Sequence, residues 1–176
     1  FDSIDFPIPE NFFDTYEGRL AASEQEMSIF KDMDLVYDLK MADKENEIHS
    51  SHLEKWGRKI YEQDLTPEQK KQWDAYYDPI IADFKSKKLS GEALARWKYE
   101  RYMRDYLSVI KSVDRNVGRV MDYLKENDLL ENTLVVYVSD QGFYMVEHGW
   151  FDKRFMYEES FRTPLLMRLP NGKREK

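Results

Sequence analysis

Asp140 and Gln141 stand side by side just beyond a short apolar run, Leu134 to Val138. Such a run, rich in β-branched residues, predicts a strand buried on both faces, as in a parallel sheet covered by helices. Open α/β sheets hold ligands just outside the carboxyl ends of their strands. Carboxylate and amide oxygens are hard donors that Ca²⁺ or Mg²⁺ prefers, so the pair could bind a divalent cation. The alternative is a simple turn, because aspartate and glycine are good turn formers.

A long polar loop follows this pair and ends at a second apolar run, Leu165 to Leu169, which we predict to be another buried strand. The ionisable side chains between the two runs include Glu147, His148, Asp152, Lys153 and Arg154. Loops of this length at the carboxyl end of a strand are usually functional. We therefore expect this loop to contribute to a site.

A long amphipathic helix must position the first strand, and we predict it from about Glu92 to about Asn127. Its apolar residues recur at spacings of three and four: Trp97, Tyr102, Met103, Tyr106, Ile110, Val113, Val117, Val120, Met121 and Leu124. A short connection leads from this helix into the strand at Leu134, which is half of a βαβ unit. The predicted fold class is therefore α/β.

The first 90 residues predict a different kind of structure. Pro7 and Pro9 forbid a regular helix, so we expect an extended segment that packs its aromatic side chains onto a larger body. Thr66, Pro67 and Gln69 predict a helix start, because threonine suits the N-cap, proline suits the first helical position, and glutamine can close a capping box. Extended chain and helical insertions are thus expected before the long helix.

Composition excludes several classes of protein. The net charge of −7 argues against a general nucleic-acid binder. The absence of cysteine excludes a disulfide framework, a thiolate zinc site and a cysteine nucleophile within these 176 residues. No stretch approaches the roughly 18–20 apolar residues of a membrane span. His49 and His52 have a spacing that can bind a metal on a helix, but no third ligand matches it, so we expect both to face solvent.

The two ends of the sequence suggest a piece of a longer protein. The chain begins at Phe1 without a methionine and ends at Lys176, shortly after an expected strand. Any signal peptide would then lie outside these residues.

Several blocks of the sequence together resemble the C-terminal metal-and-sulfate segment of the type I sulfatases, which belong to the alkaline-phosphatase-like superfamily. The blocks are Ser139-Asp140-Gln141-Gly142, Glu147-His148-Gly149, Asp152-Lys153-Arg154, and Tyr157-Glu158 followed by Arg162 and Pro164. The preceding helix, with Asp114 and Gly118-Arg119, is similar to the family's helix before that strand. The sequence of these blocks is most similar to that of bacterial enzymes that resemble N-acetylglucosamine-6-sulfatases and iduronate-2-sulfatases.

The resemblance implies that residues 1–176 are part of a single sulfatase catalytic domain. Its fold would be a partial alkaline-phosphatase-like sheet with flanking helices, a fragment of a larger domain. Residues 1–90 would form the extended segment and helical insertions. Residues 91–170 would supply the long helix, the metal-site strand, the active-site loop and the following strand.

The resemblance also implies roles for three residues, and His148 is a further candidate on its own chemistry. Asp140 and Gln141 would be ligands of one divalent cation, normally Ca²⁺, with Mg²⁺ possible. Lys153 would contact the sulfate and the nucleophile; the alternative is a surface ion pair with Asp152, which would contribute little to stability. His148 would contact the substrate or protonate a leaving group; the alternative is a buried histidine whose hydrogen bonds are satisfied within the fold.

The family nucleophile is a formylglycine made from Cys or Ser in a C/S-x-P-S/A-R motif, and these residues contain no such motif. We expect the nucleophile outside this chain, so the chain alone should not turn over a sulfate ester. The expected partners are a sulfated carbohydrate substrate and the remainder of the sulfatase chain, with no nucleic acid and no membrane span, in the periplasm or outside the cell. Two alternatives stay open: a phosphodiesterase or phosphonate hydrolase of the same superfamily, and a non-catalytic helical interaction module.

Overall fold

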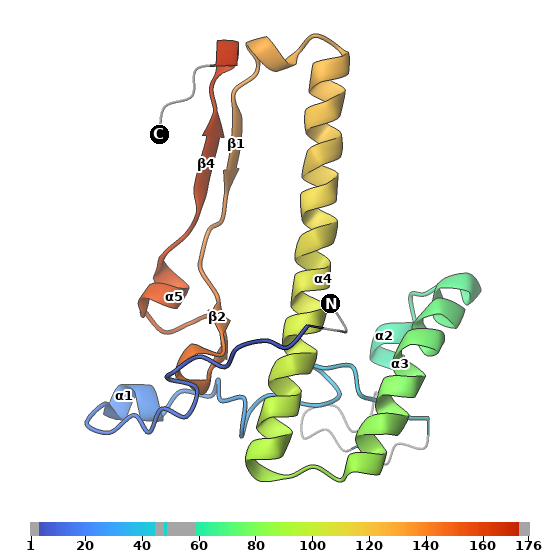
Figure 1. Cartoon of the computed structure of the whole chain (residues 1–176), viewed down its shortest axis with the longest axis vertical. Coiled ribbons are helices and arrows are strands. Elements are labelled where there is room, and N and C mark those ends of the chain that lie inside the picture. The colour runs from blue at the N-terminus through green and yellow to red at the C-terminus, as the bar shows by residue number, and fades with distance from the viewer. Residues whose placement is uncertain (1–3, 45–47, 49–58, 173–176) are drawn as a thin grey trace. The chain divides into compact units, whose positions relative to one another are not determined.

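The computed structural model describes residues 4–44, 48 and 59–172 of the chain (Figure 1). Two compact units form: unit 1 contains Phe1–Gln25 and Met103–Lys176, and unit 2 contains Glu26–Tyr102. The long helix α4 (Gly91–Glu126) begins in unit 2 and continues through unit 1, which confirms the helix predicted from its periodicity. His49 and His52 lie outside the described residues.

Unit 2 is helical where Thr66 and Pro67 predict a helix start, and it also has a short helix that the sequence did not predict. It contains α2 (Lys59–Glu62) and α3 (Pro67–Lys87) before the start of α4. The predicted capping box is present: the Gln69 amide N–H donates to Thr66 Oγ1 at 3.2 Å, and the Thr66 N–H donates to Gln69 Oε1 at 2.9 Å. These bonds satisfy N–H groups that a helix start otherwise leaves unpaired.

A buried lysine on α4 joins this helix to the irregular chain of unit 2. Lys98 is 5% exposed, and its ammonium donates to the backbone carbonyls of Met33, at 2.7 Å, and Ile29, at 3.2 Å. Burial lowers the pKa of Lys98, and the nearby carboxylates of Asp34 and Asp38 act in the opposite direction. Two carbonyls that would otherwise lack partners are thereby satisfied.

Unit 1 combines short helices, strands and the second part of α4. In chain order its other elements are α1 (Leu20–Ser23), β1 (Val135–Val138), β2 (Tyr144–Met145), β3 (Phe151–Asp152), α5 (Glu158–Phe161) and β4 (Leu165–Arg168). Among the described residues, β1 pairs with β4 and β2 pairs with β3, both antiparallel. In the first pair Val138 lies opposite Leu165, and in the second Tyr144 lies opposite Asp152.

The predicted strands β1 and β4 are present, but their environment differs from the prediction. We expected β1 to be buried on both faces in a parallel sheet, whereas its neighbour β4 is antiparallel and Val136, Tyr137 and Val138 are 47%, 42% and 59% exposed. The direction follows from the connection, because residues 139–164 return the chain without a crossover helix along the sheet. The exposure follows because a two-stranded sheet does not cover its own faces.

The core of unit 1 lies around β2 and β3 instead. Tyr144, Val146 and Trp150 are fully buried there, and Phe12 of the N-terminal segment is also fully buried. The segment before α1 is irregular and packs aromatic side chains, as predicted. No helix in the described part of the chain is long and apolar enough to cross a membrane.

Candidate functional site

The predicted cation ligands lie in the loop that directly follows β1. Asp140 is exposed and Gln141 is half-buried. Within the described ranges, the Asp140 carboxylate has no hydrogen bond or ion pair, and no group of three His, Cys, Asp or Glu side chains is placed to hold a metal. The Ser139 hydroxyl fixes the loop by donating to the Gln141 carbonyl at 2.7 Å. The pair thus offers two hard oxygen donors to a cation, and further ligands would have to come from elsewhere.

Gly142 fixes where this loop ends. Its N–H donates to the Ser160 carbonyl of α5 at 2.8 Å. A β-carbon at this position would overlap the carbonyl oxygen of Glu159 and lie 2.9 Å from that of Arg162. Only glycine therefore lets the backbone of α5 approach the loop so closely.

Lys153 follows β3 directly and is exposed. In the part of the chain that the structure describes, its ammonium has no hydrogen-bond or ion-pair partner. Asp152 pairs with Arg154 at 2.7 Å instead, so the alternative of an Asp152–Lys153 ion pair is wrong. Asp152 has a φ of 74°, and at this turn its carboxylate reaches the second residue along rather than the first. Lys153 is left available for an anion.

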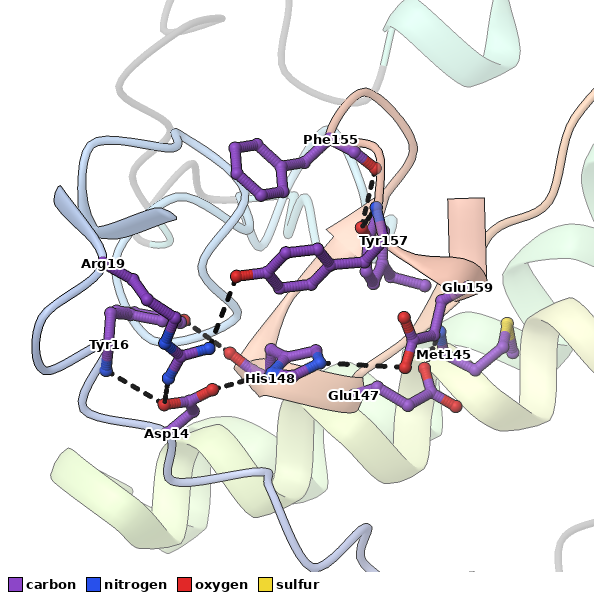
Figure 2. Close-up of polar contacts among 10 residues, drawn as sticks. Asp14, Tyr16, Arg19, Met145, Glu147, His148, Phe155, Tyr157 and Glu159 are labelled. Atoms are coloured by element: carbon purple, nitrogen blue, oxygen red, sulfur yellow. Dashed lines mark hydrogen bonds and ion pairs between the residues drawn. The ribbon is translucent and has the colours of Figure 1, made fainter. Parts of the chain in front are cut away.

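His148 lies in the loop of residues 146–154, called the site loop below, and has a partner at each ring nitrogen. Nδ1 is 2.7 Å from Asp14 Oδ2, and Nε2 is 3.7 Å from Glu159 Oε1 (Figure 2). The imidazole side chain is 18% exposed, and its ring packs 4.9 Å from that of Tyr157. Both nitrogens have partners, as expected of a histidine satisfied inside a fold. Its contact with a substrate stays a prediction.

Asp14 belongs to residues 14–19 of the N-terminal segment, called the strap below. Burial alone would raise the pKa of Asp14, but hydrogen bonds from Arg19, from His148 and from the Tyr16 N–H outweigh burial and lower it to about 2. The carboxylate is therefore charged over the whole physiological range. Together with the half-buried Arg19 it forms a charge-balanced contact beside His148.

The far end of the site loop is held by Tyr144 of β2. Its hydroxyl donates to the Phe155 carbonyl at 2.8 Å and accepts a hydrogen bond from the Tyr157 N–H at 3.3 Å. Burial raises the pKa of Tyr144 to about 12, so the hydroxyl keeps its proton and can donate. Glu147 accepts from the Met145 N–H at 2.7 Å and so fixes the near end.

The structure thus brings some predicted residues together and keeps others apart. Asp140 and Gln141 are fastened to α5 through Gly142, and Lys153 extends from β3, which pairs with β2. His148 has no hydrogen bond or ion pair with Asp140, Gln141 or Lys153 among the described residues. Its partners were missed by sequence reasoning: Asp14, Tyr16 and Glu159. Asp14 and Tyr16 lie more than 130 positions from His148, and no local pattern marks them.

Comparisons with known proteins give a consistent picture. Residues 36–176 match the protein family described as Sulfatase. The chain is 45% identical over 173 residues to an N-acetylglucosamine-6-O-sulfatase of Bacteroides thetaiotaomicron, a match that covers 98% of this chain and 30% of that protein. It is also 41% identical over 68 residues to arylsulfatase K of Canis lupus familiaris, covering 39% of this chain and 13% of that protein.

A solved structure shows the same likeness in three dimensions. The structure of BT4656 in complex with its substrate D-glucosamine-2-N,6-O-disulfate matches with a TM-score of 0.84 and 45% identity, over 97% of this chain and 34% of that one. The arrangement of helices and small sheets is thus that of a portion of a sulfatase fold, which confirms the predicted fold class. The chain spans about a third of the length of the Bacteroides protein and of BT4656.

Proposed function

Because this chain belongs to the sulfatase family, we propose that it forms part of an enzyme that hydrolyses sulfate esters on sulfated glycans. The observation that carries the proposal is that the charged groups of Asp140 and Lys153 are left open. Both are exposed, and neither has a hydrogen-bond or ion-pair partner among the described residues. A carboxylate left open after β1 suits a cation, and an ammonium left open after β3 suits an anion.

The chemistry of sulfate-ester cleavage gives a role to both charged groups. Negative charge builds on the bridging and non-bridging oxygens as the S–O bond breaks, and a fixed positive charge stabilises it. Lys153 would supply one such charge at the end of β3. A divalent cation, Ca²⁺ by preference and Mg²⁺ possibly, would add further positive charge when bound.

The side chains of Asp140 and Gln141 would hold that cation. Their donor set fits, since a carboxylate and an amide carbonyl are oxygen ligands. Gly142 would keep the two side chains in place by anchoring the loop to α5. The remaining ligands and the formylglycine nucleophile would come from sequence outside this chain, so the 176 residues alone should release no sulfate.

The substrate class follows from the relatives. A 6-O-sulfated glucosamine unit is our proposed target, because the related Bacteroides protein is named an N-acetylglucosamine-6-O-sulfatase and the substrate named for BT4656 is a glucosamine disulfate. Sulfated glycans are met outside the cell, so we propose a periplasmic or extracellular enzyme. The family match weighs against the interaction-module alternative, and the relatives' names weigh against a phosphodiesterase or phosphonate hydrolase.

Peptide mass spectrometry on the protein from its native source tests the nucleophile. We expect a C/S-x-P-S/A-R peptide whose first residue carries the mass change of formylglycine. An unmodified Ser or Thr nucleophile in another sequence setting would contradict the sulfatase assignment and favour phosphoryl transfer.

A further inference from the structure

We propose that Asp14 and Tyr16 of the strap are positioning residues, which hold the site loop in the conformation that presents Lys153. The part of this inference that concerns sulfate rests on the proposed function. The part that concerns conformation rests on contacts within unit 1 alone. The two parts can therefore fail separately.

The backbone of the site loop is strained. Val146, His148 and Asp152 have φ angles of 73°, 57° and 74°, in the left-handed region that L-residues avoid. The strain is most severe at Val146, because its branched side chain tolerates this region least. A strained backbone persists only where contacts with the surrounding structure hold it in place. The loop therefore depends on contacts from outside itself.

The strap supplies two of these contacts, both to His148. The Tyr16 hydroxyl donates to the backbone carbonyl of His148 at 2.5 Å, and Asp14 Oδ2 lies 2.7 Å from its Nδ1 (Figure 2). One contact fixes the peptide unit that follows the left-handed residue, and the other fixes the imidazole ring. Loss of either leaves His148 held by its remaining contacts only.

The strap is held by contacts of its own. Arg19 donates to Asp14 and, at 3.4 Å, to the hydroxyl of Tyr157, while the Tyr16 N–H donates to Asp14 at 2.9 Å. The Tyr16 ring stacks on the fully buried Trp150, with ring centroids 5.2 Å apart and planes within 18°. These contacts hold the side chains of Asp14 and Tyr16 where they meet the loop.

The route from the strap to Lys153 is short. Trp150 immediately precedes β3, and Asp152 at the end of β3 lies opposite Tyr144 of β2. Lys153 is the next residue. A loop fixed at His148 and Trp150 therefore fixes the direction in which the chain leaves β3, and with it the direction of Lys153.

Trypsin digestion of the full chain tests whether the contacts of Asp14 and Tyr16 with His148 hold the site loop. We call this pair of contacts the clamp. Lys153 and Arg154 are exposed, so trypsin can reach the bonds that follow them once the loop opens. We expect Tyr16→Phe and Asp14→Asn to raise the cleavage rate there about fivefold, because proteolysis follows the open population and each variant loses one hydrogen bond. Tyr16→Phe keeps the ring that stacks on Trp150.

Matched controls separate the clamp from general stability. Tyr123→Phe and Asp64→Asn make the same chemical changes at exposed positions and should leave the cleavage rate at Lys153 and Arg154 unchanged. Cleavage after Lys88, beyond the end of α3 in unit 2, serves as the internal reference. Equal acceleration at Lys88 and at the site loop, or no acceleration at the loop, would overturn the proposal.

A spectroscopic signature tests Asp14 directly. The chain has three histidines, so a long-range ¹H–¹⁵N spectrum shows few ring signals, and His148→Gln identifies those of His148 by their loss. We expect Asp14→Asn to move the Nδ1 signal of His148 while those of His49 and His52 stay in place. An unmoved Nδ1 signal would show that Asp14 does not contact the imidazole of His148 in solution. That result would overturn the positioning role of Asp14.

These readouts require no sulfatase activity. A loop that responds to both strap variants in a protein without a formylglycine would leave the clamp standing and the proposed function wrong. An active sulfatase whose loop responds to neither variant would leave the proposed function standing and overturn the positioning role of the strap.

Discussion

The Nδ1 atom of His148 lies 2.7 Å from a carboxylate oxygen of Asp14, although 134 residues separate the two in the chain. This contact joins the N-terminal strap to the loop that carries Lys153. On the other side of the ring, Nε2 faces Glu159, whose backbone packs against Gly142 beside Asp140 and Gln141. One imidazole thus lies between the N-terminal strap and the helix that anchors the candidate cation loop.

The Asp14 carboxylate should make stability depend on acid pH. Its pKa is about 2 in the folded chain against an ordinary 3.8, so the folded state binds the proton less well than the unfolded state. The stabilisation is then complete above pH 3.8 and is lost as pH falls towards 2. Urea unfolding across this range should show a smaller loss for Asp14→Asn than for the wild-type chain. Parallel curves for the two proteins would contradict the assignment.

Gly142→Ala should destabilise the chain by about 1–3 kcal/mol, because the new methyl group would overlap the Glu159 carbonyl and the backbone of α5 would have to move. Gly118→Ala is the matched control. Gly118 lies inside α4 with no heavy atom within 4 Å of an added β-carbon, so alanine there should stabilise by about 0.5–1 kcal/mol. Chemical denaturation measures both, and a neutral Gly142→Ala would show that α5 does not press on the loop.

Lys98→Ala should lower the free energy of unfolding by about 1–3 kcal/mol, because the backbone carbonyls of Ile29 and Met33 lose their buried donor. Lys71→Ala makes the same change at an exposed position of α3 and should stay within about 0.5 kcal/mol of wild type. Similar values for the two variants would mean that Lys98 does not hold the irregular chain of unit 2 to α4.

Local signals in the sequence account for what could be predicted. The helix α4 follows from apolar spacing, the start of α3 from Thr66 and Gln69, and the position of β1 from its β-branched run. Each of these depends on residues a few positions apart. The family blocks added the expected places of Asp140 and Lys153 on the loops that follow β1 and β3.

Long-range contacts account for what was missed. Nothing near Asp14 or Tyr16 in the sequence indicates His148, because the contact exists only once the chain has folded. The direction of β4 depends on how residues 139–164 return, which strand periodicity does not encode. The alternative of an Asp152–Lys153 ion pair is wrong for a local reason: Asp152 has a positive φ, and its carboxylate pairs with Arg154 instead.

The central claim is that Asp140 and Lys153 perform sulfatase chemistry, and a chimera tests it most directly. Residues 1–176 would replace the aligned portion of the Bacteroides N-acetylglucosamine-6-O-sulfatase, whose remaining sequence supplies the rest of the catalytic domain. Sulfate released from D-glucosamine-2-N,6-O-disulfate, the substrate named for BT4656, would be measured by ion chromatography, with circular dichroism as the check on folding. We expect the chimera to release sulfate, and Asp140→Asn and Lys153→Ala to slow release at least about a hundredfold without unfolding the protein. A folded chimera that releases no sulfate, or one in which both variants keep the full rate, would contradict the account.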